Sequence, residues 1–168
     1  KNENKSLTAP HDLKRVRFDQ LYQSNQKRFA RIALTYAGKE HQQDLLQDIW
    51  HQLWRSLDNF ALGSKADTWA YRVALNTAIS FVRKDSKQNR VQDSVSALEP
   101  IQSASMSEAM FLVLQFMASL SDIDKAAFLM YLDGFNHSQI AGTLAISNTN
   151  VAVKINRMKS KFEQMYLE

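Results

Sequence analysis

The chain of 168 residues contains no cysteine, only two prolines and only four glycines. Without cysteine it can form neither disulfides nor thiolate metal sites, which is compatible with a reducing cytoplasm. So few glycines and prolines argue against a turn-rich β fold and favour long helices joined by short turns. No apolar run approaches the ~18 residues that a membrane-spanning helix needs. We therefore expect an all-α, cytoplasmic protein without membrane insertion.

The charge is only mildly unbalanced, with a formal net charge of +4. A small basic excess permits nucleic-acid binding but does not require it. Its distribution is more informative, because the basic residues gather near positions 14–17, 27–31, 83–90 and 154–161. The stretch 41–58, by contrast, is acidic and polar on one side.

Residues 41–58 carry the most regular helical pattern of the chain. Their apolar residues recur at the i, i+3, i+4, i+7 spacing of an α-helix, and we expect Trp50 and Trp54 to be large buried anchors. The polar residues share the remaining arc: Asp44, Gln47, Asp48, His51, Gln52 and Arg55. Taken alone, this pattern is typical of a core helix with one solvated face.

The other segments divide the chain into two helical domains. A helix from Phe18 should end at Gly38, after a frayed and polar stretch 1–13. A loop at 59–66 precedes a helix at 68–84, which Asp67 or Thr68 can cap. Residues 85–104 lack helical periodicity and are interpreted as a flexible linker. The domains are therefore predicted at 1–84 and 105–168.

The region 137–162 has the layout of a helix-turn-helix, with a short helix, a tight joint at 145–147 and a longer basic helix. The second helix of this motif usually enters the DNA major groove. Arg157 could read guanine, Asn156 adenine, and Ala152 and Val153 a thymine methyl group. The residues proposed to contact DNA are Thr149, Asn150, Ala152, Val153, Lys154, Asn156, Arg157 and Lys159, with the lysines suited to phosphates.

Three blocks, in this order, resemble the extracytoplasmic-function (ECF) group of bacterial RNA polymerase sigma factors. Residues 44–54 are similar to the helix by which this family binds core polymerase. Residues 68–79 with Arg83-Lys84 resemble its helix that opens and reads the −10 element. Residues 132–154 resemble its motif that reads the −35 element.

The resemblance implies a sigma factor, not an enzyme, that directs promoter-specific initiation and needs no cofactor. Its partners would be core RNA polymerase (the clamp helices of the largest subunit and the flap of the second-largest), promoter DNA and an anti-sigma factor. The polar arc of 41–58 would face the clamp helices. A flipped base of the −10 element would be held by the loop 59–66. The −10 contacts implied are Phe60, Leu62, Ser64, Lys65, Trp69, Arg72, Asn76, Arg83 and Lys84.

Other functions can be formulated from the same residues. A helix-turn-helix repressor or activator, acting without polymerase, would use the aromatic and methionine stripes as a ligand pocket or dimer seam. A helical interaction module without a DNA function is a further alternative. His41, Asp44, Asp48 and His51 could share a helical face and hold a metal, but no matching ligands are evident on other helices.

Overall fold

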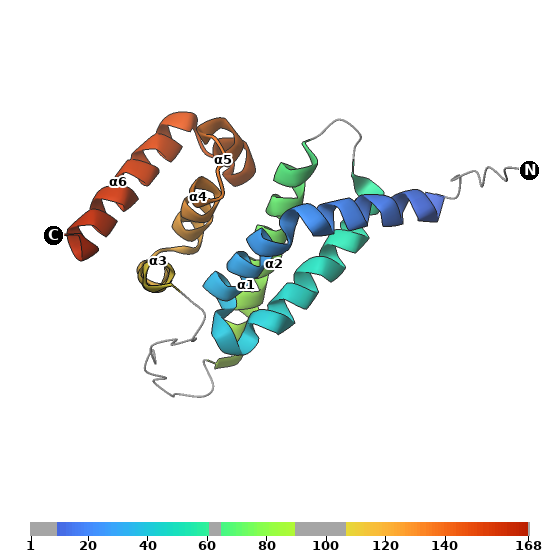
Figure 1. Cartoon of the computed structure of the whole chain (residues 1–168), viewed down its shortest axis with the longest axis horizontal. Helices are drawn as coiled ribbons and strands as arrows, with labels where there is room; N and C mark the ends of the chain where they lie inside the picture. Colours follow the sequence, from blue (N-terminus) through green and yellow to red (C-terminus); the bar gives the residue numbers. More distant parts are fainter. Residues whose placement is uncertain (1–9, 61–64, 90–106, 168) are drawn as a thin grey trace, which may run out of the picture.

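The computed structural model describes residues 10–60, 65–89 and 107–167. These parts are almost entirely helical and contain no strand, which confirms the all-α prediction. Figure 1 shows a long bent helix packed on a second helix, with the shorter helices of the C-terminal part beside them. The elements are α1 (Pro10–Ser56), the 3-10 turn η1 (Leu57–Asn59), α2 (Ala66–Asn89), α3 (Glu108–Ala118), α4 (Asp122–Leu132), α5 (His137–Leu144) and α6 (Asn148–Tyr166).

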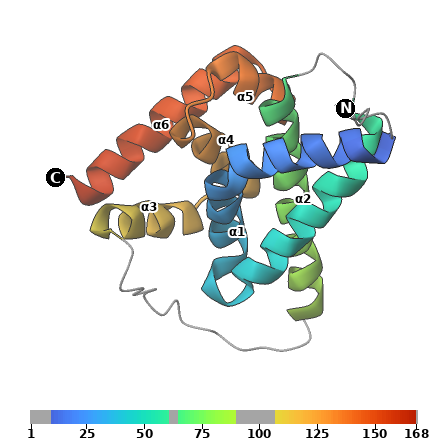
Figure 2. The ribbon, with the colours of Figure 1, turned by 45° about the vertical axis from the view of Figure 1, so that its right-hand side comes forward.

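The long helix α1 is two helices joined at Gly38. This glycine has φ 71° and ψ 177°, a conformation that residues with a side chain rarely adopt. The chain reverses there, so the arms 10–37 and 39–56 form a V, which is visible in Figures 1 and 2. The predicted end of the first helix at Gly38 is confirmed. The predicted frayed start is wrong for residues 10–13, because Pro10 opens a helix that is stabilised by packing on the second arm.

The core of the N-terminal domain is a stripe on the second arm of α1. Leu45, Ile49 and Leu53 are completely buried, against Phe29 and Ile32 on the first arm. Helix α2 closes the bundle with a buried face of its own, formed by Ala70, Tyr71, Ala74, Leu75 and Ala78. Burying such apolar side chains stabilises the fold by about 1.5–3 kcal/mol for each large residue.

Trp50 and Trp54 pack against this core, as expected of anchors, but they are only partly buried. The leucines and isoleucine occupy the centre of the bundle. The tryptophans lie one position further round the helix, where the first arm covers only part of each ring. A wide apolar arc predicts which side of a helix faces the core, but not which of its residues lie at the centre of the bundle.

Helix α2 differs from its prediction at both ends. It begins at Ala66, so Asp67 lies in its first turn, where its carboxylate accepts a hydrogen bond of 3.1 Å from the buried Asn25 side chain. It ends at Asn89, five residues beyond the predicted Lys84. The first residues assigned to the linker are therefore helical. The rest of that linker falls within 90–106, outside the described residues.

The C-terminal domain comprises α3 to α6 around Phe116, Met130, Ile140 and Ile155. Side chains cap three of its helices: Ser121 caps α4, Ser147 caps α6, and Asn136 with Gln139 forms a capping box on α5. Ala145 ends α5 with φ 55° and ψ 44°, which makes the tight turn between the two helices of the helix-turn-helix.

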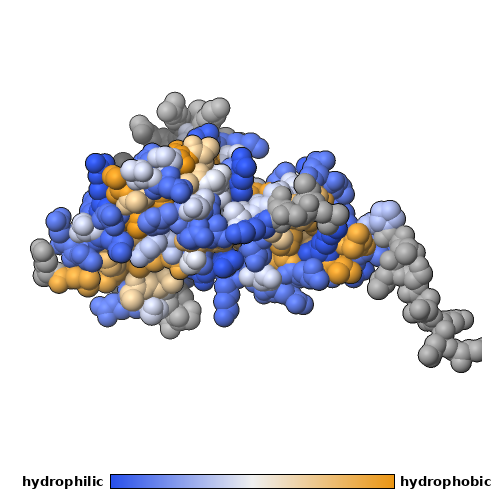
Figure 3. Space-filling model, turned by 90° about the horizontal axis from the view of Figure 1, so that it is seen from above, coloured by the Kyte–Doolittle hydropathy of each residue, from blue (hydrophilic) through white to orange (hydrophobic). Residues whose placement is uncertain are grey.

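The two domains pack against each other through α5 on α2 and α3 on α1. Figure 2 shows α5 beside the start of α2. Hydrophilic residues cover most of the face seen in Figure 3, and the apolar areas on it are interrupted. Of the helices in the described parts, none combines the length and apolar character that crossing a membrane requires.

Candidate polymerase and nucleic-acid interfaces

The polar face of α1 is the first candidate interface, and the structure places all of its predicted residues on the surface. They follow one another along the second arm, opposite the buried stripe of Leu45, Ile49 and Leu53. Because that stripe holds the backbone of the arm, the face is presented on a rigid element. Its exposed side chains are Asp44, Gln47, Asp48, His51, Gln52 and Arg55.

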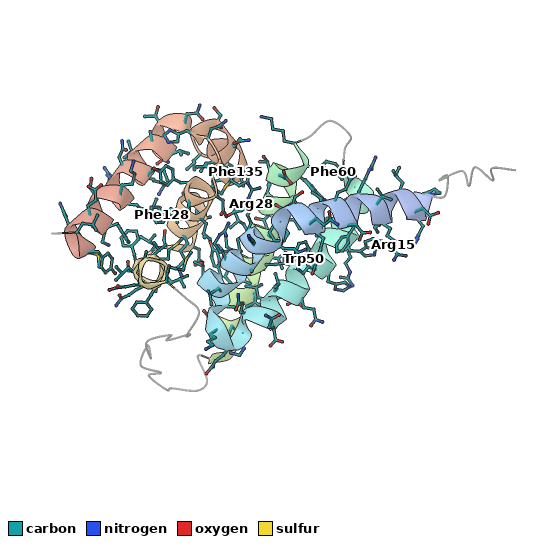
Figure 4. All side chains as sticks on the ribbon, in the orientation of Figure 1. Arg15, Arg28, Trp50, Phe60, Phe128 and Phe135 are labelled. Carbon is teal, nitrogen blue, oxygen red and sulfur yellow. The ribbon has the colours of Figure 1, made fainter. Side chains whose placement is uncertain are left out.

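Beside this face lies an aromatic pocket of about 830 Å³ between the two arms of α1. Trp50 contacts Phe18 with ring centroids 6.0 Å apart, and Trp54 contacts the same ring at 5.4 Å, both edge to face. The Lys14 ammonium lies 4.4 Å from the Trp54 ring centre and forms an ion pair of 2.9 Å with Asp58. Figure 4 shows Trp50 between the arms.

The rim of this pocket joins it to the polar face, since Gln47, Asp48 and His51 line both. Arg15 and Asp19 line its other side, and the sequence prediction did not include them. Their spacing of four residues around Phe18 was the signal that could have found them, because it places all three on one side of a helix.

A second groove, of about 510 Å³, separates α1 from α2. One bank is formed by Asp48, His51, Gln52 and Arg55 of the polar face. The opposite bank includes Asn76 and Lys84, which were predicted to contact the −10 element, together with Thr77 and Ser80. The structure therefore brings two sets of residues predicted for different partners into one groove, here called the α1–α2 groove.

The remaining residues predicted for the −10 element lie elsewhere. Lys65, Trp69 and Arg72 line a cleft of about 280 Å³ between α2 and α5, here called the α2–α5 cleft. The Trp69 ring also packs on Phe60, with ring centroids 4.6 Å apart. Arg83 is exposed on α2. Leu62 and Ser64 lie outside the described residues.

The outer side of α6 carries most of the residues predicted for the −35 element. Val151, Ile155 and Met158 face the domain core, which leaves Thr149, Asn150, Val153, Asn156 and Arg157 exposed, and Ala152 partly exposed. Ser147 accepts a hydrogen bond from the Asn150 amide and so fixes the start of the helix.

The two lysines predicted to bind phosphates are engaged within the domain. Lys154 forms an ion pair of 2.8 Å with Asp124, and the Lys159 ammonium lies 5.4 Å from the centre of the Tyr131 ring. Both partners belong to α4. In this arrangement Lys154 would have to exchange Asp124 for a DNA phosphate, whereas Arg157 has no described partner to release.

His41, Asp44, Asp48 and His51 do not assemble into a metal site. Within the described ranges, no three histidine, cysteine, aspartate or glutamate side chains lie close enough together to hold an ion.

Two tyrosines with raised pKa values, Tyr36 and Tyr71, lie at the contact between the domains. Burial is the main cause for both Tyr36 and Tyr71, and the nearby carboxylates of Asp122 and Asp133 add to it.

Comparisons with known proteins agree with this two-domain arrangement. The model of sigma-70 region 2 matches residues 21–88, and a model of sigma-70 region 4 matches residues 110–162. The ECF RNA polymerase sigma factor SigM of Bacillus subtilis (strain 168) is 26% identical over 154 residues, which cover 88% of this chain and 94% of that protein.

Two solved structures share the fold. The sigma factor RpoE from Bartonella quintana, solved in complex with the anti-sigma factor NepR, superposes with a TM-score of 0.74 at 18% identity, covering 88% of this chain and 94% of that one. CnrH, solved in complex with the cytosolic domain of CnrY, gives a TM-score of 0.62 at 19% identity, covering 88% and 86%.

These matches and the helix-turn-helix define the class first: the chain belongs to the sigma-70 family of RNA polymerase sigma factors. Within that family it is an ECF sigma factor, a subunit that directs transcription initiation to promoters.

Proposed function

We propose that the polar face of α1 docks on the clamp helices of core RNA polymerase, and that the α1–α2 groove then takes up the separated −10 strand. The observation that carries this proposal is the shared groove. Asp48, His51 and Arg55 stand on one bank, and Asn76 and Lys84 on the other, so a polymerase bound to α1 would border the DNA path.

The chemistry of each bank supports its assignment. The exposed carboxylates of Asp44 and Asp48 suit a cationic protein partner and would repel DNA phosphates. Lys84 and Arg83 on α2 supply positive charge for a DNA backbone, and Asn76 can donate and accept hydrogen bonds at a base edge. The second domain reads the −35 element through Asn156 and Arg157 on the exposed side of α6, and its other partner surface would be the polymerase flap.

The test is co-elution with core polymerase in gel filtration, followed by run-off transcription from a library of genomic fragments. Asp48→Arg should leave the free energy of unfolding within about 0.5 kcal/mol of the parent, because Asp48 is exposed. It should weaken polymerase binding by about 2–5 kcal/mol, as expected when a charge in an interface is reversed. Glu163→Arg reverses an exposed charge on α6 and should co-elute normally. Co-elution of Asp48→Arg at parental affinity would contradict the assignment.

An anti-sigma factor is the further partner that the family implies, and the similar sigma factor RpoE was solved in complex with one. An apolar groove of about 420 Å³ offers a surface for it. Leu34 of α1 and Met110, Leu114 and Met117 of α3 line this groove, so a single partner helix could contact both domains. Co-purification of such a partner should be lost in Leu114→Asp and kept in Glu163→Arg.

A further inference from the structure

Asp133 makes the most specific contact between the two domains. It follows α4, in the turn that leads into the helix-turn-helix, and only 2% of its side chain is exposed. Its Oδ1 pairs with the Arg31 guanidinium, and its Oδ2 accepts a hydrogen bond of 2.8 Å from the Tyr71 hydroxyl. Both partners belong to the N-terminal domain, 102 and 62 residues away in sequence.

A carboxylate buried this deeply is unfavourable unless it is paired. The hydrogen bonds described for the Asp133 side chain all go to α1 and α2, so its own domain does not satisfy it. Tyr71 is equally dependent, because its ring is completely buried and its hydroxyl donates to Asp133. Separation of the domains must therefore break these bonds together and return the charged groups to water.

The surroundings reinforce the same contact. The Phe135 ring packs on Tyr71 with centroids 5.0 Å apart, and the Arg28 guanidinium lies 4.9 Å from the Phe135 ring centre. Arg28 also donates to the Asp133 carbonyl at 3.4 Å. Figure 4 shows Arg28 and Phe135 close together where the domains meet.

This contact places α5 across a narrow cleft from part of the surface predicted to bind the −10 element, where Lys65 and Arg72 are exposed and Trp69 is partly buried. Lys65, Trp69 and Arg72 form one wall of the α2–α5 cleft, and Ser138, Gln139, Gly142 and Thr143 of α5 form the other. A DNA strand that stacks on Trp69 or pairs with Arg72 needs the space that α5 occupies.

We propose that Asp133 is a latch: by binding Arg31 and Tyr71 it holds the free sigma factor closed, with α5 standing across the cleft from Lys65, Trp69 and Arg72, and it must release them before a DNA strand can bind along this wall. The part concerning DNA rests on the proposed function, extended from the α1–α2 groove to the −10 contacts predicted for this wall. The part concerning closure rests on the contacts alone.

The latch can be broken from the N-terminal side, which leaves the helix-turn-helix unchanged. Arg31→Gln with Tyr71→Phe removes both partners of Asp133 and keeps the Tyr71 ring. A matched control is Lys14→Gln with Tyr22→Phe on α1, which also removes one positive charge and one tyrosine hydroxyl. There, Lys14 pairs with Asp58 inside the N-terminal domain, and Tyr22 is 41% exposed.

Closure is measured by cross-linking, for which the absence of cysteine is an advantage. Thr68→Cys and Ser138→Cys place one thiol on each wall of the α2–α5 cleft. The rate of joining by a short bismaleimide then reports the closed population. Loss of hydrogen bonds to a charged group should lower that rate about tenfold to a hundredfold in the latch variant. The control pair should react at the parental rate, and Tyr71→Phe alone should give a smaller decrease.

The DNA part is measured in the full-length chain without cysteines, by binding to single-stranded oligo(dT), which needs no promoter sequence. The latch variant should bind oligo(dT) about tenfold more tightly than the control pair, which has also lost one positive charge. An unchanged cross-linking rate in a variant of parental helicity would overturn the latch. Opening without tighter oligo(dT) binding would show that α5 does not hinder DNA binding along this wall. Neither result depends on polymerase, so failure here is distinct from failure to co-elute.

Discussion

Phe18 on the first arm of α1 contacts both Trp50 and Trp54, and Phe18→Ala tests what these contacts do. Replacing a fully buried phenylalanine by alanine costs about 3–5 kcal/mol, and Phe18 is only partly buried, so about 2 kcal/mol is expected. The two edge-to-face contacts with Trp50 and Trp54 add about 0.5 kcal/mol each, at the low end of their range. The total, about 3 kcal/mol, leaves a domain of ordinary stability folded.

The same substitution should weaken polymerase binding, although Phe18 lies outside the polar face. Without the Phe18 ring, the side chains of Trp50 and Trp54 would be more mobile in the free protein. Because they lie beside the polar face, they would have to be ordered when polymerase binds. Ordering a side chain costs about 0.5–1.5 kcal/mol, so we expect about a tenfold loss of affinity. Urea unfolding, tryptophan emission and titration with core polymerase measure the three effects.

Phe162→Ala is the control for this prediction. Phe162 is also partly buried and packs on Phe116, with ring centroids 5.4 Å apart, in a domain that contains none of the three tryptophans. It should cost similar stability while leaving tryptophan emission unchanged. If Phe18→Ala also leaves emission and polymerase affinity at parental values, the first arm does not order the tryptophans, and the reasoning fails.

Three further predictions concern single residues. Ala145→Gly should raise stability by up to about 1 kcal/mol in thermal unfolding, because a left-handed alanine is strained and the entropy of glycine offsets only part of the gain. Burial raises the pKa of Tyr71 in the folded protein, so its stabilising contribution is complete below about pH 10 and is lost at higher pH. In urea unfolding, the free energy of unfolding should therefore decrease less at alkaline pH in Tyr71→Phe than in the parent. Arg157→Ala should reduce discrimination against altered −35 bases by about 1–3 kcal/mol in run-off transcription, whereas Lys154→Ala should lower initiation similarly on all promoters.

Local sequence was sufficient for the helices and most of their ends. Gly38, Ser147 and the pair Asn136 with Gln139 each act on backbone groups within one turn, so their effect can be predicted from neighbouring residues. The exposed arcs of α1 and α6 were also predictable, because apolar residues that recur with a period of 3.6 mark the buried side of a helix and leave the solvent-exposed side to polar residues.

The errors arose where tertiary contacts override local pattern. Residues 10–13 read as polar and frayed, yet His11 lies against Trp54, with ring centroids 6.0 Å apart, and helps the arm to stay helical. The end of α2 lacks apolar periodicity but continues as a helix to Asn89. A segment made only of polar residues, such as 85–89, leaves no apolar signal in the sequence, so its helicity could not be predicted from periodicity.

The candidate interfaces were predicted residue by residue, but their arrangement was not. Nothing local indicates that Arg31, Tyr71 and Asp133 meet, because they come from α1, α2 and the turn after α4, in two domains. Nor does the sequence indicate that Lys65 and Arg72 face α5 while Asn76 faces the polar side of α1. Such pairings depend on how the domains pack, which follows from the sum of many contacts and not from one motif.

That division of the predicted −10 surface has a mechanistic consequence. The polar face of α1 and the α1–α2 groove are open to a partner while the domains are together, whereas the Trp69 wall faces α5 across a narrow cleft. On the latch proposal, polymerase can therefore bind the closed form, but DNA cannot fully engage it. A polymerase that binds the open form more tightly would draw the equilibrium towards it and move α5 away from Trp69 and Arg72 only in the complex. The sigma factor would then reach promoters as a polymerase subunit and leave free DNA largely unoccupied, because the step that frees the approach to its −10 wall is coupled to docking.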